Sequence, residues 1–104
     1  MIDWDRIAEL QEEVGEEDFA EVLDMFFSEV EDALNGLSDA SPEGWASGLH
    51  FLKGAALNIG MEALSTQCRD AEIALKADPG AQIEATALRA THQASLDELR
   101  ALIA

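Results

Sequence analysis

The sequence predicts an all-α fold: an antiparallel four-helix bundle with a short N-terminal helix packed across one end. Apolar residues recur at helical spacing along most of the chain. The composition agrees, because 18 of the 104 residues are Ala, three are Val and none is Tyr. Leu, Ile, Val and Phe supply 26 residues, above the roughly 20% below which a highly charged chain stays disordered. We therefore expect one folded domain over residues 1–104.

The first two helices are indicated by apolar stripes between clear end signals. Asp3 is a suitable N-cap for a helix over residues 4–14, and Gly15 is a suitable stop. The inward side of this helix is expected to carry Trp4, Ile7, Leu10 and Val14. A second helix begins near Glu16–Asp18, whose charges suit a helix N-terminus, and ends at or close to Asn35-Gly36. Its inward stripe consists of Phe19, Val22, Leu23, Phe26, Val30, Ala33 and Leu34.

Three further helices complete the predicted fold. After a connection over residues 37–40, Ser41-Pro42 suits the N-cap and first position of a helix over 42–59, which closes on Gly60. A fourth helix covers 62–77, and Asp78-Pro79-Gly80 separates it from a last helix over about 82–103. Short connections of this kind favour antiparallel neighbours. The expected inward residues of the fourth helix are Leu64, Cys68, Ala71 and Leu75. Those of the last helix are Ile83, Ala87, Ala90 or Thr91, Ala94, Leu99 and Leu102.

The charge of the chain excludes several classes of partner. The net charge is −16, and residues 1–43 hold 15 acidic side chains against one basic side chain, Arg6. Such a surface repels nucleic-acid phosphates and anionic membranes. The N-terminus shows no signal peptide, no apolar stretch approaches 18 residues, and the single cysteine, Cys68, excludes an internal disulfide. We expect a cytoplasmic monomer that binds neither nucleic acid nor membrane.

One histidine stands beside the core stripe of the third helix. That stripe consists of Trp45, Leu49, Leu52, Ala56 and Ile59. His50 follows Leu49 and is therefore rotated by about 100° from it, which predicts a partly exposed ring at the flank of the core. Lys53 and Gly54 lie three and four residues further on, on the same face as the histidine.

The residues around the histidine suit phosphoryl transfer. A free imidazole has a pKa near 6.5, so much of it is a neutral nucleophile at cytoplasmic pH. Lys53 can neutralise charge on the phosphoryl oxygens. Gly54 in a helix interior costs roughly 1 kcal/mol of stability relative to Ala. This cost indicates that something packs closely against Gly54, either a partner or another helix of the bundle. Because the chain has no phosphate-binding glycine loop, the phosphoryl donor and acceptor must come from other proteins.

A second stripe beside the core indicates a docking face. It consists of Ala46, His50, Gly54, Leu57 and Met61. Leu57 can equally well widen the core. The second helix is the neighbour that can add contacts, but the sequence does not select among its residues.

The motif resembles a known family. The run His50-x-x-Lys53-Gly54-Ala55-Ala56-x-x-Ile59-Gly60 is similar to the signature of histidine-containing phosphotransfer (HPt) domains, which are four-helix-bundle carriers of multistep two-component phosphorelays. The resemblance extends through length and helix order to nearly the whole chain. It implies a carrier with no ATP site and no cofactor of its own.

The resemblance also assigns roles to residues. It implies that His50 accepts the phosphoryl group on the ring nitrogen distal to the backbone, that Lys53 supports this group, that Gly54 leaves room for it, and that Gly60 ends the motif. The implied partners are receiver domains of response regulators or hybrid histidine kinases, which offer an aspartate and a bound Mg²⁺.

Two positions depart from the family or its relatives. Some members carry a glutamine 22 residues after the histidine, where this chain has Glu72, a carboxylate that could orient the ring but would repel a phosphoryl group. The residue after His50 is Phe51, whereas the dimerisation helices of sensor kinases usually have an acid there, which argues for a separate carrier rather than a kinase core.

Three other interpretations compete with a carrier. A di-iron bundle would need Glu-x-x-His, but Ser47 and Arg89 occupy the glutamate positions before His50 and His92, and His92 is expected at the surface or its boundary. A calcium site would need an EF-hand loop, which the sequence lacks. An enzyme with its own active site would need a catalytic triad, which the sequence also lacks. An acidic adaptor or nucleic-acid mimic without phosphate chemistry would explain the charge but not the histidine motif. An HPt-like fold without its relay role is a milder form of that alternative.

Overall fold

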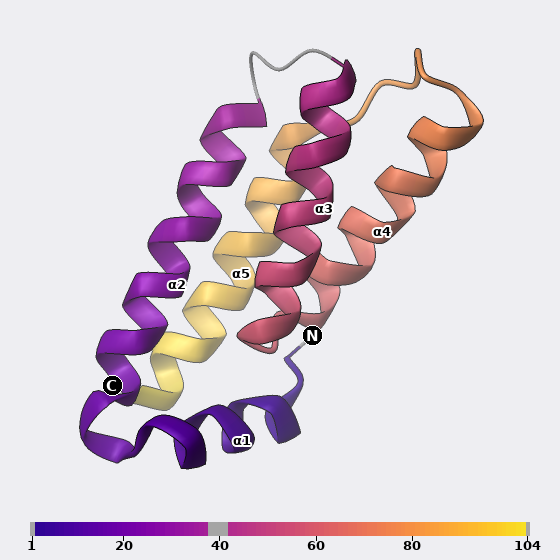
Figure 1. Ribbon diagram of the computed structural model, residues 1–104. Helices are drawn as coiled ribbons and strands as arrows, with labels where there is room; N and C mark the ends of the chain where they lie inside the picture. The colour runs from indigo at the N-terminus through magenta and orange to yellow at the C-terminus, as the bar shows by residue number, and fades with distance from the viewer. Residues whose placement is uncertain (1, 38–41, 104) are drawn as a thin grey trace.

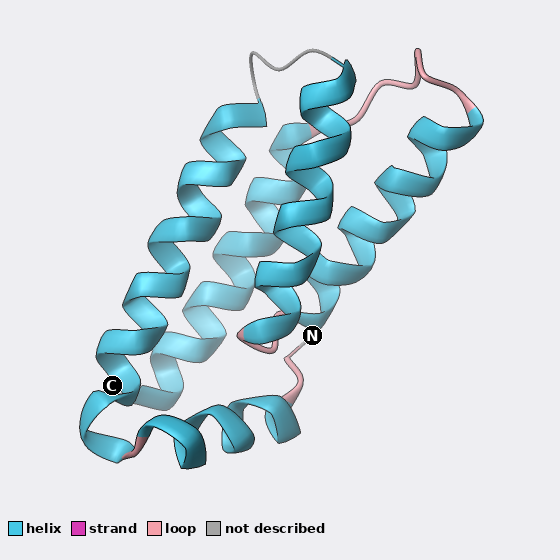
Figure 2. Ribbon diagram, in the orientation of Figure 1, coloured by secondary structure: helices cyan, strands magenta, loops and turns pink. Residues whose placement is uncertain are grey.

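The computed structural model describes residues 2–37 and 42–103. Within these residues the fold consists of five helices, coloured along the chain in Figure 1, and of no strand (Figure 2). The helices are α1 (Trp4–Val14), α2 (Glu16–Leu37), α3 (Pro42–Asn58), α4 (Glu62–Ala77) and α5 (Ala85–Ile103). The predicted all-α class is therefore confirmed.

The four longer helices lie alongside one another. Helices α2 and α3, α3 and α4, α4 and α5, and α5 and α2 are in contact, which closes a ring around the core. Consecutive long helices run in opposite directions, and α1 lies across one end of them against α2 (Figure 1). In the part of the chain described, no helix is both long and apolar enough to cross a membrane.

Local signals set most of the helix ends. The Asp3 carboxylate accepts a hydrogen bond from the backbone N–H of Arg6 at 3.2 Å, which confirms it as the N-cap of α1. Gly15 has φ +83° and donates its N–H to the carbonyl of Gln11 at 2.9 Å, so it ends α1 as predicted. The bounds predicted for α1 and α4 are met, and the predicted cap Ser41 lies outside the described residues.

Three helix ends differ from prediction. Helix α2 includes Leu37, expected in the connection, because Leu37 lies three residues after Leu34 and is buried on the same face. The remainder of that connection, 38–40, is outside the described residues. Helix α3 ends at Asn58 rather than at Ile59, and α5 begins at Ala85, three residues later than predicted.

The core confirms most of the predicted stripes of α1 to α4. On α3, Leu49, Leu52, Ala56 and Ile59 are buried and Trp45 is partly buried. Cys68 is fully buried on α4, as expected. Trp4 was wrongly placed in the core, since 47% of its surface is exposed at the start of α1. On α2 the buried phenylalanine next to Phe26 is Phe27, which the predicted stripe lacks.

The inward face of α5 was predicted correctly only in part: Leu99 is buried as expected, and Thr91, the alternative to Ala90, is partly buried. The three alanines expected inside, Ala87, Ala90 and Ala94, are exposed. The buried residues of this helix are Leu88, His92, Ser95, Leu96 and Leu99. The true stripe lies about one residue further along, because two of its members are polar and alanines cover the opposite side, which leaves little contrast in the sequence. The side chain of Leu102 is outside the described residues.

A turn after α3 joins the helices to the N-terminal segment. Gly60 has φ +71° and accepts a hydrogen bond on its carbonyl from the N–H of Asp3 at 2.8 Å. The Arg6 Nε donates to the carbonyl of Asn58 at 2.9 Å, which satisfies one of the free carbonyls at the end of α3. This end of the histidine-bearing helix is therefore held by α1 and the residues before it.

Candidate functional site

The His50 side chain lies on the outer flank of α3. It follows the fully buried Leu49, and 76% of its side chain is exposed to solvent. The helix therefore points the ring outward, as its position beside the core stripe predicted. A partner can reach this imidazole without any movement of the surrounding helices.

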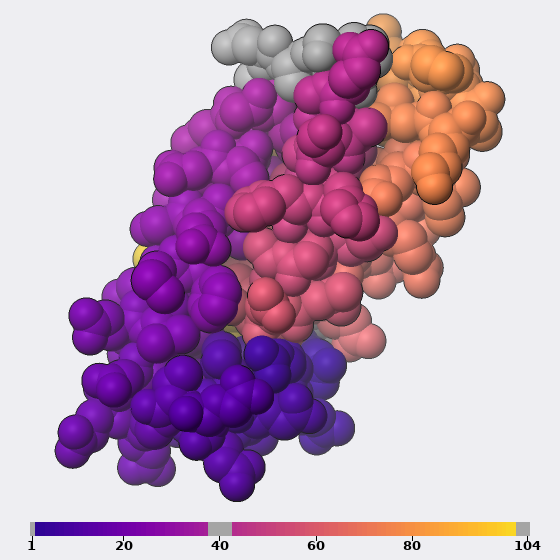
Figure 3. Space-filling model, viewed as in Figure 1, coloured from indigo at the N-terminus to yellow at the C-terminus, as the bar shows by residue number. Residues whose placement is uncertain are grey.

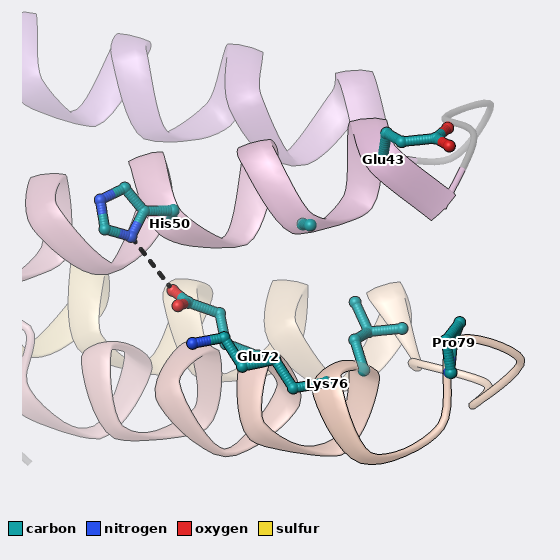
Figure 4. A pocket seen from close by; sticks show the side chains of 7 residues that line it. Glu43, His50, Glu72, Lys76 and Pro79 are labelled. Carbon is teal, nitrogen blue, oxygen red and sulfur yellow. Dashed lines mark ion pairs between the residues drawn. The ribbon is translucent and has the colours of Figure 1, made fainter.

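The Glu72 carboxylate from α4 lies between the ring and an ammonium group. Its Oε2 accepts a hydrogen bond from Lys53 Nζ at 3.3 Å, and its Oε1 lies 3.7 Å from His50 Nδ1. Figure 4 shows this carboxylate pointing from α4 toward the ring, with the ion pair drawn as a dashed line. The Glu72 side chain is only 17% exposed, so its charge acts with less screening than a surface carboxylate. The three side chains form one cluster across α3 and α4.

This cluster distinguishes the two ring nitrogens of His50. An imidazole nitrogen that faces a carboxylate is favoured as the protonated one, because the N–H is attracted to the negative oxygen. The separation of 3.7 Å between Nδ1 and Glu72 Oε1 is longer than a hydrogen bond, and Oε1 is buried without another hydrogen-bond partner among the described residues. A small rotation of the exposed ring would close the bond. The other nitrogen, Nε2, then keeps its lone pair.

The surroundings of Gly54 are open. A Cβ atom placed on this residue would meet nothing within 4 Å outside its own helix. The packing alternative, in which another helix of the bundle approaches Gly54, is therefore wrong. By contrast, a Cβ on Gly60 would lie 2.9 Å from the carbonyl of Asp3, so that glycine is required by the fold. Gly54 leaves free space on the His50 face for something outside the chain.

Two of the three predicted docking residues are available. Ala46 is exposed one turn before His50, and Leu57 is 55% exposed, so Leu57 does not widen the core. Met61 was wrongly predicted, because it is fully buried and its backbone forms a bridge with Ile2. The turn at Gly60 breaks the helical spacing on which that prediction relied.

Two grooves meet at the histidine. One, about 460 Å³ in volume, runs between α3 and α4 (Figure 4), and its lining includes His50, Ala46, Leu75 and Lys76. The other, about 330 Å³, runs between α2 and α3 and is lined by Phe26, Glu29, His50, Phe51, Gly54, Ala55 and Asn58. The α2 contribution, Phe26 and Glu29, could not be selected from sequence. For the exposed Phe51, the sequence offered one indication of a role in the site: it is a large aromatic residue that directly follows His50 and lies outside the core stripe.

The second histidine belongs to a different environment. His92 is buried on α5, contrary to the expected surface position, and its Nε2 lies 3.8 Å from Glu31 Oε1 on α2. Burial lowers the pKa of His92, and the nearby Glu31 opposes that effect in part. Among residues 2–37 and 42–103, no group of three or more histidine, cysteine or acidic side chains could hold a metal ion.

Comparison with known proteins agrees with the geometry around His50. The family model described as Hpt domain matches residues 21–104, which include α3 with His50, Lys53 and Gly54. Searches of curated proteins and of solved structures found no match. Since the family model covers most of the chain, the chain belongs to the Hpt domain family.

Proposed function

We propose that this chain is a histidine phosphotransfer protein of a multistep two-component phosphorelay, with His50 as the phosphoacceptor. Hpt domains are phosphocarrier modules of phosphorelay signalling and have no ATP site of their own. The observation that carries the proposal is the outward-facing His50 ring, which has the Glu72 carboxylate on its Nδ1 side and the open position of Gly54 one turn away. No other described histidine is accessible, since His92 is buried.

The transfer step balances in both directions. The Nε2 lone pair of His50 attacks the phosphorus of an aspartyl phosphate; an N–P bond forms, and the bond from phosphorus to the aspartate oxygen breaks. Aspartate leaves as a carboxylate, and the ring acquires positive charge that faces Glu72 Oε1. In onward transfer, an oxygen of a second aspartate attacks the phosphorus, the N–P bond breaks and the neutral ring is restored.

Lys53 supports the phosphoryl group in this proposal. An ammonium group has three N–H donors, and one of them is directed to Glu72 Oε2. A second can reach a phosphoryl oxygen while the first stays in place. The carboxylate thus holds the ammonium close to the ring, and the ammonium offsets the repulsion between this carboxylate and the phosphoryl group.

The partners in this proposal are receiver domains of response regulators or hybrid histidine kinases. They supply the aspartate and a bound Mg²⁺, and the chain supplies no cofactor. We further propose a cytoplasmic monomer whose residues 1–104 form one domain, with α2 to α5 as an antiparallel four-helix bundle. The net charge of −16 supports the expectation that neither nucleic acid nor an anionic membrane is a partner.

Phosphate transfer from a panel of phosphorylated receiver domains tests the proposal. The wild type is expected to acquire an acid-labile, base-stable label, and His50→Gln is expected to acquire none. His92→Gln serves as the control for a second histidine, with circular dichroism to verify that each variant is folded. Equal labelling of the wild type and His50→Gln would place the acceptor elsewhere. No labelling from any donor would overturn the carrier and favour an acidic adaptor.

A further inference from the structure

The α2 side of the His50 face combines an apolar groove with negative charge. Phe26 and Phe51 line the groove between α2 and α3, and Glu29 lies in the same lining. Phe51 is about half exposed although it is a large aromatic side chain. Exposed aromatic surface beside an accessible reactive group is typical of a docking site.

The acidic part of this surface continues along α2. The exposed residues Asp18, Glu21, Met25, Glu29 and Asp32 are spaced three, four, four and three, so they form one stripe along the helix. Four of the five are carboxylates, and Glu29 belongs to both the stripe and the groove. Figure 3 shows α2 and α3 side by side on one face of the molecule, with α1 across its end.

Among the described residues, the positive side chain that reaches α2 is Arg89 of α5, which donates to Asn35 Oδ1 at 2.7 Å and to the Leu34 carbonyl at 3.1 Å, beyond the last carboxylate of the stripe. The sequence has no Lys or Arg between Arg6 and Lys53. Arg6 pairs with Glu9 and Glu13 on α1, and Lys53 pairs with Glu72 on the α4 side of His50. The α2 side of the groove therefore carries the carboxylates of the stripe, whereas the positive charge near the ring, on Lys53, lies on the α4 side of His50.

From this asymmetry we propose that α2 selects the partner by charge. The cognate receiver domain inserts an apolar side chain into the groove between Phe26 and Phe51 and places Lys or Arg side chains against the stripe of Asp18, Glu21, Glu29 and Asp32. This inference rests on the proposed phosphotransfer function and adds the chemistry of the partner surface. A receiver with an acidic or neutral surface at this place docks poorly, because like charges repel and buried carboxylates lack partners. Attraction at long range also orients the partner before contact.

The test compares two matched double variants. Asp18→Lys with Glu29→Lys reverses charge on the stripe, and Glu16→Lys with Glu98→Lys makes the same change in net charge away from it, on the opposite side of α2 and on α5. Asp18 and Glu16 both lie in the first turn of α2, and Glu29 and Glu98 are both exposed. Glu16 lies two residues before Asp18, five before Glu21 and 13 before Glu29, and hence at least about 140° around the helix from each.

The measurement is the second-order rate constant for transfer from the receiver domain that labels the wild type most rapidly. We expect a fall of at least about 10-fold in the wild type between 50 mM and 500 mM salt, because added salt screens steering. The stripe variant is expected to be slower by about 10-fold or more at low salt and nearly insensitive to salt, while the control variant stays close to wild type. Phe51→Ser is expected to slow transfer, and Ile73→Ser, with similar exposure on α4, is not.

Each outcome decides the question. Equal losses in the two double variants would show that only net charge matters and would overturn the selective stripe. Rates unaffected by salt and by both pairs would overturn the electrostatic contact while the phosphotransfer function stands. Failure of every donor to label the wild type would overturn the proposed function and this inference with it.

Discussion

Gly54 is expected to show opposite effects of one substitution on stability and on transfer. The residue is in the interior of α3, its φ is not positive, and a Cβ would meet nothing within 4 Å. Gly54→Ala therefore introduces no strain and removes the helix penalty of glycine, about 0.8–1.0 kcal/mol. For a domain of this size, about 1 kcal/mol corresponds to a rise in Tm of about 4–8 °C.

The same substitution is expected to slow phosphotransfer. His50 and Gly54 are four residues apart on the outer face of α3, so a side chain at 54 stands next to the ring where a partner must approach. We expect a graded loss from Gly to Ala to Leu, since each step adds volume on that face. A displacement of the reacting groups by about 1 Å can cost about 100-fold in rate, which is the loss we expect for Gly54→Leu.

Gly36 provides the matched control. It is also in a helix, and a Cβ atom added to it would meet no atom of the described residues within 4 Å, but it lies in the last turn of α2, about 10 Å along the helix from Glu29 and the groove beside His50. Gly36→Ala and Gly36→Leu are expected to raise Tm by at most the same amount, because helix ends gain less, and to leave transfer unchanged. Thermal unfolding followed by circular dichroism and the transfer assay from a phosphorylated receiver give both readouts.

Two results would refute this reasoning. If Gly54→Leu transfers phosphate at the wild-type rate, the open space beside His50 is not used by the partner. If Gly54→Ala lowers Tm, the glycine is required by packing within the fold, and its surroundings are not open. A rise in Tm together with slower transfer is the only combination that supports an opening kept for function.

Other positions give independent expectations. In ¹⁵N NMR spectra, the neutral His50 ring is expected to carry its proton on Nδ1, and Glu72→Leu to shift the population toward the Nε2–H form; an unchanged ratio would contradict the orienting role. Burial raises the pKa of the Cys68 thiol to about 12, so alkylation near neutral pH should require unfolding, and rapid labelling of the folded protein would be inconsistent with this. Burial lowers the pKa of His92, so its contribution to stability is present above the unfolded pKa of about 6.5 and is lost as pH falls below it; urea unfolding at pH 7.5 and 5.5 should show this loss in the wild type and less in His92→Gln. Gly60→Ala should cost about 2–4 kcal/mol in urea unfolding, because its φ is +71° and its Cβ would lie 2.9 Å from a backbone carbonyl; a near-neutral effect would contradict the close contact.

Features that depend on neighbours along the chain were predictable. The ends of α1 follow from Asp3 and Gly15, whose side chain and φ angle act within one turn. The outward direction of His50 follows from its place after Leu49, because helix geometry alone sets the angle between consecutive residues. These predictions needed no knowledge of what lies across the core.

The side of a helix that packs inward was harder to predict where the two sides differ little in polarity. The inward face of α5 was misjudged because His92 and Ser95 are buried while Ala90 and Ala94 are exposed. Met61 was misplaced because the stripe from Leu57 was continued through a turn where helical spacing no longer holds. In both cases the local pattern was too weak, or too short, to determine which side packs inward.

The sequence by itself determined that the chain is helical, where most helices begin and end, and that His50 with Lys53 and Gly54 shares one exposed face. Hydrogen bonds and side-chain spacing within a helix act over a few residues, so these features are encoded locally. Only the tertiary structure decided that Glu72 pairs with Lys53 while it faces the His50 ring, that nothing in the described chain fills the space at Gly54, and that Phe26 and Glu29 of α2 line a groove beside His50. Those features depend on how α3 packs against α4 and α2, which is set by the whole core rather than by any one segment.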